Sequence, residues 1–137
     1  MNIRLLITAA LLFASVVSQA QISVPKVVQL DMTQRYPAAK NVTWKREQRN
    51  YAAMWTDKTS GQNTAVFTSG GALVAVFSPA PVKFLPPAIA AYVKAQYKTT
   101  ISSAQKKTTV IGKEFYVINT RSGKTLLFDP DGKPIRH

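Results

Sequence analysis

Two segments of the chain carry apolar residues at helical spacing. In residues 24–36, VPKVVQLDMTQRY, apolar positions recur every four residues, and residues 85–97, LPPAIAAYVKAQY, repeat the pattern. A proline near the start of each segment suits the first helical turn, where the missing N–H costs no hydrogen bond. We therefore predict one helix in each segment. The shared stripe consists of Val24, Val28, Met32 and Tyr36 in the first segment and of Leu85, Ile89, Val93 and Tyr97 in the second.

Each predicted helix is followed by short runs rich in aromatic and β-branched residues, which are separated by turn-forming residues. Short strands joined by short turns pair antiparallel, so each helix is expected to pack on antiparallel sheet. Pro79-Ala80-Pro81 cannot join a central strand, because proline has no N–H to donate, and residues 79–84 are assigned to a linker. The predicted strands are 41–48, 51–57, 63–68 and 72–78 in the first half, and 101–110, 114–120, 125–129 and 133–137 in the second.

The two halves correspond to one another at an offset of 61 residues. The offset relates the two helical stripes, and it also relates Phe67 to Phe128 and Gly71 to Gly132. The matching positions mark helix ends, a strand end and a turn glycine. We therefore predict an α+β fold of two tandem α-β-β-β-β repeats, 24–78 and 85–137. A half of roughly 55–60 residues is marginal alone, so the halves are expected to share a core.

The first twenty residues have the features of a cleaved signal peptide. A basic start at Arg4 is followed by an uncharged run, Leu5–Val17, and then by Ser18-Gln19-Ala20, which has small residues where a signal peptidase requires them. A transmembrane anchor is the alternative, but the run is short of the ~20 residues that a spanning helix needs. We predict cleavage between Ala20 and Gln21. The mature chain, 21–137, is then expected in the periplasm or outside the cell.

The composition leaves little material for catalysis. The chain has no Cys and a single His, at position 137, which excludes thiol chemistry, thiolate metal sites and histidine pairs. Asp129-Pro130-Asp131-Gly132 is read as a hairpin turn and not as a calcium loop, because no closing Glu follows it. We predict no catalytic residue, cofactor or metal, and no enzymatic activity.

Aromatic and basic residues alternate along two neighbouring predicted strands. Side chains alternate between the faces of a strand, so Trp44 and Arg46 share a face, and so do Tyr51 and Trp55. Trp, Tyr and Arg are favoured anchors of protein interfaces, so these four residues, with Tyr116 in the second half, are candidates for partner binding. The alternative is that the aromatic rings pack under the first helix. We expect Met54 to point into the core and Trp55 to point away from it.

Several short motifs extend over both halves. They are Tyr36-Pro37-Ala38-Ala39-Lys40-Asn41-Val42-Thr43-Trp44-Lys45, Tyr51, Phe67 and Gly71 in the first half, and Leu85-Pro86, Tyr92, Tyr97-Lys98 and Leu127-Phe128-Asp129-Pro130-Asp131-Gly132-Lys133 in the second. With these motifs, residues 24–137 resemble the PepSY-like family of small exported bacterial proteins. The resemblance implies a β-lactamase-inhibitor-like fold, export, and no established biochemical activity. The turn Ser69-Gly70-Gly71 departs from the acidic form of turn seen at 129–132.

The mature chain is strongly basic along its whole length. Loss of Arg4 leaves 17 basic and 6 acidic residues, a net charge of +11, and no basic block accounts for it. Export argues against nucleic acid, so an acidic envelope component or an unidentified protein is the expected partner, with solubility alone as the other explanation of the charge. We predict an exported, non-enzymatic interaction module, inhibitor-type in its action. The alternative is a charge-driven binder of anionic envelope polymer or lipid head groups.

Overall fold

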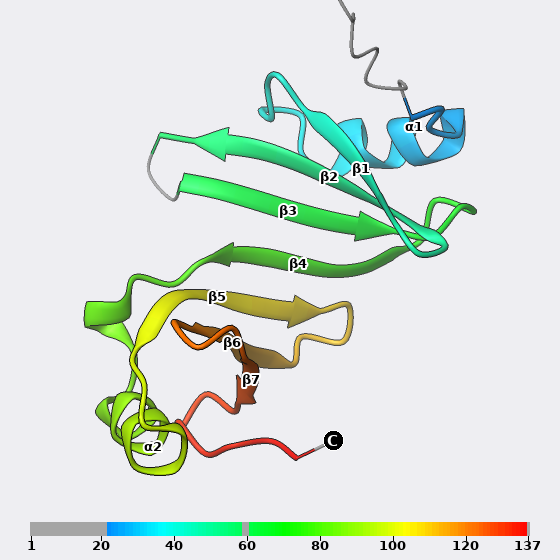
Figure 1. The fold of residues 1–137 in the computed structure, drawn as a ribbon. Helices are drawn as coiled ribbons and strands as arrows, with labels where there is room; N and C mark the ends of the chain where they lie inside the picture. The colour runs from blue at the N-terminus through cyan, green and yellow to red at the C-terminus, as the bar shows by residue number, and fades with distance from the viewer. Residues whose placement is uncertain (1–21, 59–60, 137) are drawn as a thin grey trace, which may run out of the picture.

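The fold is a single antiparallel sheet with two helices, given by a computed structural model that describes residues 22–58 and 61–136. Within this part of the chain seven strands follow one another in the sheet in chain order (Figure 1). The predicted signal peptide and its cleavage site lie outside the described residues. The elements are α1 (Lys26–Arg35), β1 (Thr43–Glu47), β2 (Asn50–Asp57), β3 (Gly61–Phe67), β4 (Leu73–Pro79), the 3₁₀ helix η1 (Val82–Phe84), α2 (Pro87–Tyr97), β5 (Ile101–Thr109), β6 (Glu114–Thr120) and β7 (Thr125–Phe128).

Both helices lie on the same face of the sheet, α1 beside β1–β3 and α2 beside β5–β7 (Figure 1). Residues directly opposite one another in an antiparallel pair share a face. Ala65, which packs under α1, pairs with Val76, and Val76 pairs with Thr108. Two residues from Thr108, Lys106 pairs with Tyr116, which packs under α2. The opposite face of the sheet has no helix among the described residues.

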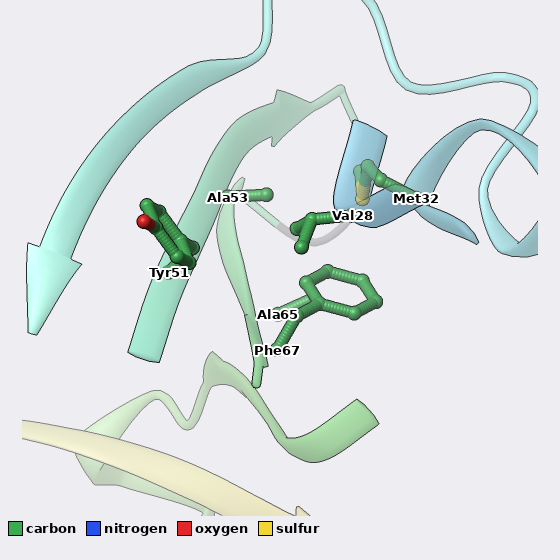
Figure 2. Packing of buried hydrophobic residues seen from close by; sticks show 6 residues of the cluster. All are labelled: Val28, Met32, Tyr51, Ala53, Ala65 and Phe67. Carbon is green, nitrogen blue, oxygen red and sulfur yellow. The ribbon is translucent and has the colours of Figure 1, made fainter. Parts of the chain in front are cut away.

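Each helix buries the middle two residues of the stripe that the sequence predicts. Val28 and Met32 of α1 pack on Ala53, Ala65 and Phe67 of the sheet (Figure 2). Ile89 and Val93 of α2 pack in the same way on Ile118 and Phe128. The prolines also act as expected, since the carbonyl of Pro25 accepts the N–H groups of Val28 and Gln29, and Pro87 is the first residue of α2.

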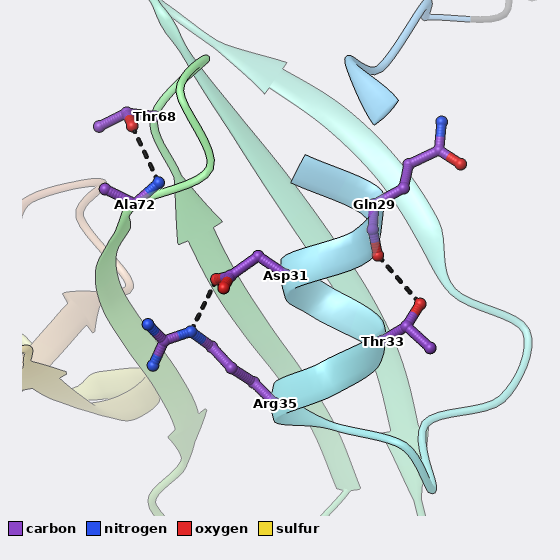
Figure 3. Close-up of polar contacts among 6 residues, drawn as sticks. All are labelled: Gln29, Asp31, Thr33, Arg35, Thr68 and Ala72. Carbon is purple, nitrogen blue, oxygen red and sulfur yellow. Dashed lines mark hydrogen bonds and ion pairs between the residues drawn. The ribbon is translucent and has the colours of Figure 1, made fainter. Parts of the chain in front are cut away.

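The turn before β4 and the turn after β7 are built alike, although their sequences differ. The Thr68 hydroxyl accepts the N–H of Ala72 (Figure 3), and the Asp129 carboxylate accepts the N–H of Lys133 at the equivalent position. This carboxylate also accepts the N–H of Asp131, so the reading of 129–132 as a hairpin turn is confirmed. The threonine supplies the same backbone contact as the aspartate, which is why the first turn needs no acidic residue.

Two predictions about strands are wrong. Residues 133–136 form no strand: the segment makes one isolated bridge, Phe128↔Pro134, because Pro134 cannot continue a ladder of N–H donors. Pro79 does belong to a central strand. It is the last residue of β4, opposite Gln105, at a point where the ladder between β3 and β4 has already ended at Thr64↔Phe77, so its missing N–H breaks no pairing to β3.

The two halves share a sheet and not a core. One buried cluster lies under α1 and a separate one under α2, so the expected common core is wrong. The halves are joined by the ladder between β4 and β5, which has five residue pairs from Ala75↔Thr109 to Pro79↔Gln105. Each helix covers only the strands nearest to it, which leaves the middle of the sheet between the helices uncovered by either cluster.

Candidate interaction site

All five predicted binding residues lie on the face of the sheet that carries the helices, and four of them lie together in the first half. Arg46 pairs with Tyr51, and Trp44 pairs with Ala53, which is two residues from Trp55. Trp44, Arg46, Tyr51 and Trp55 therefore all point toward α1, as the alternation of side chains predicts. Tyr116 is on the same face but in the second half, where it packs against the cluster under α2.

Trp44 and Tyr51 serve mainly as packing residues. Tyr51 is 6% exposed, and the Arg46 guanidinium lies 5.3 Å from the centre of its ring. Trp44 is half-buried, with its ring centre 6.3 Å from that of Phe67. Rings held in this way stabilise the cluster under α1, as the alternative reading of the sequence expects.

The predicted orientation of Met54 and Trp55 is wrong. Trp55 packs against the cluster under α1, with its ring 4.8 Å from that of Tyr36. Met54 pairs with Thr43 and Thr64 and therefore points to the face of the sheet that carries no helix. Trp55 is only half-buried, because α1 ends at Arg35, and the chain that follows the helix leaves one side of the indole open.

An open cleft of about 680 Å³ lies beside Trp55, and we name it the aromatic cleft. Its walls are the end of α1, the loop that follows α1, and the ends of β2 and β3. Tyr36 and Trp55 supply aromatic surface, with their ring planes tilted by 39° to one another, and Val76 extends this surface toward the middle of the sheet. The full lining is Arg35, Tyr36, Pro37, Ala38, Ala39, Lys40, Trp55, Thr56, Asp57, Lys58, Asn63 and Val76.

The rim of the aromatic cleft is mainly basic. Arg35, Lys40 and Lys58 line it, together with one carboxylate, Asp57. The Arg35 Nε atom lies 2.7 Å from an oxygen of Asp31 one turn earlier in α1 (Figure 3), which holds this guanidinium at the helix end. Burial raises the pKa of the Tyr36 hydroxyl; nearby Arg35 lowers it and Asp31 raises it further. Tyr36 therefore stays neutral at physiological pH and offers an O–H group as a donor.

The aromatic cleft continues around the edge of β2. The pairing of β1 with β2 ends at Thr43↔Met54, so residues 55–57 of β2 lie beyond the end of β1. A second hollow of about 500 Å³ lies at this edge and shares Lys40, Trp55, Thr56 and Lys58 with the first. An extended ligand is therefore able to run from the helix side of the sheet across the strand edge.

Of the five residues that the sequence predicts for partner binding, only Trp55 lines the aromatic cleft. Tyr36, Lys40 and Asn63 were missed as site residues. Tyr36 and Lys40 belong to the YPAAK run, which supports the family resemblance. The run begins at the last residue of the predicted helix stripe and continues beyond it, and this continuation is the signal that marks the two residues. Asn63 carries no such signal: it is 7% exposed, and its side-chain N–H donates to the Gly61 carbonyl.

Two features of the described residues concern metal ligands and membrane-spanning helices. In residues 22–58 and 61–136 no three His, Cys, Asp or Glu side chains lie close enough to hold a metal ion. Within the same ranges no helix has the length and apolar character needed to cross a bilayer.

The protein is therefore of the class that has an antiparallel sheet with helices on one face, and here the sheet carries an aromatic cleft. Solved structures of Bacteroides proteins share this fold. A candidate periplasmic protein from Bacteroides eggerthii is 18% identical, with a TM-score of 0.70 over 83% of this chain and 87% of that one. A DUF2874 family protein from Bacteroides uniformis is 19% identical, with a TM-score of 0.70 over 83% and 88%. A BLIP-like protein from Bacteroides fragilis is 15% identical, with a TM-score of 0.65 over 85% and 86%.

No protein-family model and no curated protein matches the chain. At such low identity the likeness to solved structures shows the fold, and a shared fold does not fix a function. The BLIP-like structure supports the β-lactamase-inhibitor-like α+β fold that the sequence predicts. Membership of the PepSY-like family stays a prediction.

Proposed function

We propose that the mature chain is an exported, non-enzymatic binding module that holds an acidic peptide segment of a partner protein in the aromatic cleft. The observation that supports this proposal most directly is that Tyr36 and Trp55 form an open aromatic floor, with Lys40 and Lys58 on the rim. The likeness to a candidate periplasmic protein supports an exported site of action. The likeness to a BLIP-like protein supports an inhibitor-type action, in which binding itself is the function.

The chemistry of the cleft favours a peptide over a fully polar ligand. Tyr36, Ala39, Trp55 and Val76 give the hollow an apolar surface, and burying such surface stabilises a complex only if the ligand has apolar groups of its own. The basic rim attracts carboxylates, and the Tyr36 hydroxyl is available to donate a hydrogen bond to one of them. An acidic peptide with an apolar side chain satisfies both requirements.

Two variants of equal charge test whether the cleft or the overall charge binds. Lys40→Gln/Lys58→Gln removes two charges from the rim, and Lys94→Gln/Lys98→Gln removes two charges at the end of α2. We expect the rim variant to weaken binding of a labelled acidic peptide roughly five- to tenfold and the α2 variant to weaken it less than about twofold. Fluorescence anisotropy at constant salt measures both. Equal losses in the two variants would contradict a localised site.

A second candidate function rests on the charge of the whole chain. A mature chain of +11 with basic residues in both halves fits a charge-driven binder of anionic envelope polymer or lipid head groups. Such binding falls steeply as salt rises, whereas a contact anchored by Trp55 persists at higher salt. Repeating the peptide titration at low and high salt therefore distinguishes the two functions.

Two finer features belong to the same proposal. The module is released by cleavage between Ala20 and Gln21, and it consists of two repeats, 24–78 and 85–137. Equivalent contacts in the two halves support the repeats. A Cβ atom built on Gly71 would lie 3.1 Å from a Val27 methyl group, and one built on Gly132 would lie 3.5 Å from Ala88, which is 61 residues after Val27. Trp44, Arg46 and Tyr116 act in this account by supporting the sheet face, with Trp55 as the residue that touches the ligand.

A further inference from the structure

Four hairpin turns in the described chain are built to one plan, but one of them differs in composition. In each turn the Thr or Asp that begins it accepts, on its side chain, the N–H of the residue four positions later, and a Gly occupies the fourth position with a positive φ. Three turns carry Ser69-Gly70, Arg121-Ser122 and Pro130-Asp131 at their centres, and the turn between β5 and β6 carries Val110-Ile111.

The turn between β5 and β6 does not need Val110 and Ile111 in order to form. The Thr109 hydroxyl and Gly112 supply the contacts that the turn requires. Val110 is 61% exposed and Ile111 is 77% exposed, so neither contributes much to a core. Val74 is 37% exposed and directly precedes Ala75, whose partner in β5, Thr109, directly precedes Val110. Adjacent exposed aliphatic residues of this kind mark an interaction site.

Basic residues flank this aliphatic tip, which we define as Val74, Val110 and Ile111. Lys107 lies two residues before the turn begins and Lys113 directly after the turn glycine. The one carboxylate nearby in the sequence, Glu114, lies 3.4 Å from the ammonium group of Lys106 and is thereby neutralised. The tip therefore combines protruding aliphatic side chains with two lysines close by in the sequence, of which Lys107 has its ammonium group 5.7 Å from the centre of the Phe77 ring.

We infer that the aliphatic tip is a membrane-docking element that inserts into the interface of an anionic lipid bilayer. Aliphatic side chains that protrude from a narrow turn reach past the head groups, and the neighbouring lysines remain at the depth of the lipid phosphates. Charge complementarity favours a bilayer as the occupant, because the whole mature chain is positive. The inference is independent of the aromatic cleft. The cleft is lined by residues at the end of β2 and near the start of β3, and these strand ends lie opposite to the end of β5 that carries the tip (Figure 1).

Vesicle binding by the mature chain tests the inference. The variant Val110→Ser/Ile111→Ser gives this turn the polarity of the other three, and Phe84→Ser removes an equally exposed apolar residue, 74% exposed, at the far end of β5. With vesicles of phosphatidylcholine and phosphatidylglycerol, we expect the double variant to bind at least about tenfold more weakly and Phe84→Ser to bind within about twofold of the wild type. Unchanged melting curves establish that the variants are folded.

An environment-sensitive dye attached to an introduced cysteine measures insertion directly. The chain has no cysteine of its own, so the dye reacts only at the chosen position. A dye on Ile111→Cys is expected to increase in fluorescence when anionic vesicles are added, and a dye on Arg121→Cys, in the turn between β6 and β7, is not. Three results overturn the inference: no vesicle binding by the wild type, equal loss in Phe84→Ser and the double variant, or equal dye responses at 111 and 121. Loss of a wild-type dimer in the double variant without any vesicle binding would instead assign the tip to a second copy of the chain.

Discussion

Trp55 and its neighbour Met54 show how far a single residue is predictable. Alternation along a strand correctly groups Trp55 with Trp44, Arg46 and Tyr51. The alternation does not show which face of the strand meets the helix. Trp55 and Met54 are both large and apolar, so either one is able to fill a core. The answer depends on Tyr36, whose ring packs against Trp55 from the loop beyond α1. That contact joins residues far apart in the sequence, and no local pattern encodes it.

Tyr36 gives a prediction at the residue scale. Its pKa in the folded chain is above the ordinary value of 10.0, mainly because of burial. The group therefore keeps its proton more tightly in the folded state than in the unfolded state. Its contribution to stability is complete below pH ~10 and is lost as the pH rises through the folded pKa.

An absorbance titration of tyrosinate in the wild type, minus that in Tyr36→Phe, isolates this residue. We expect the difference curve to have its midpoint above pH ~10, and the loss of folding stability at alkaline pH to be smaller in Tyr36→Phe. A midpoint at or below the ordinary value would show that the hydroxyl is not buried in the aromatic cleft.

At the scale of elements, local chemistry predicts more than it does for single residues. The helices, seven of the eight strands and the turn at 129–132 follow from apolar spacing, early prolines and turn glycines. The eighth strand fails because its central residue is Pro134, and Pro79 is accepted in a central strand because of where the neighbouring ladder ends. Proline positions are judged correctly only when the pairing partner of each N–H is known, and pairing is a long-range property.

Two glycines that differ in their surroundings test the packing of a turn on a helix. Gly71 has a φ of 88°, and a Cβ there would lie 3.1 Å from a Val27 methyl group and 3.3 Å from the Val27 carbonyl oxygen. Gly112 has a φ of 82°, and apart from its two chain neighbours no described residue has an atom within 4 Å of the same point. Gly112→Ala thus measures backbone strain alone, and Gly71→Ala measures strain plus crowding against α1.

We expect Gly112→Ala to lower the free energy of unfolding by about 1–2 kcal/mol and Gly71→Ala to lower it by at least about 1 kcal/mol more. Urea unfolding of both variants measures the difference. Equal losses would show that the turn before β4 does not pack closely on α1.

At the scale of the whole molecule, the sheet is what unites the two halves. The sequence predicts two similar halves but not that each keeps its own buried cluster. Whether two helices share a core depends on how far apart they lie on the sheet. The spacing of apolar residues within each helix does not predict that distance. The joint between the halves is the ladder from Ala75↔Thr109 to Pro79↔Gln105.

Cutting the mature chain in the linker gives fragments 21–80 and 82–137. We expect neither fragment alone to unfold cooperatively, because each has only about 60 residues and exposes a full strand edge where β4 and β5 had paired. Mixing the fragments is expected to restore the sheet and a cooperative melt. A sharp transition in either fragment alone, near that of the intact chain, would show that the halves are independent domains.

The proposed function depends most on the binding of an acidic peptide in the aromatic cleft, and the two tryptophans report on this binding within one molecule. Trp55 lines the cleft, and Trp44 packs on Phe67 away from it. In ¹⁵N-correlated NMR spectra each indole N–H gives its own signal. On titration with an acidic peptide, we expect the Trp55 signal to shift with the backbone N–H signals of residues 35–36, 38–40 and 55–58, while the Trp44 signal stays in place. Small shifts spread over lysines throughout the chain, with Trp55 unmoved, would contradict the proposed function.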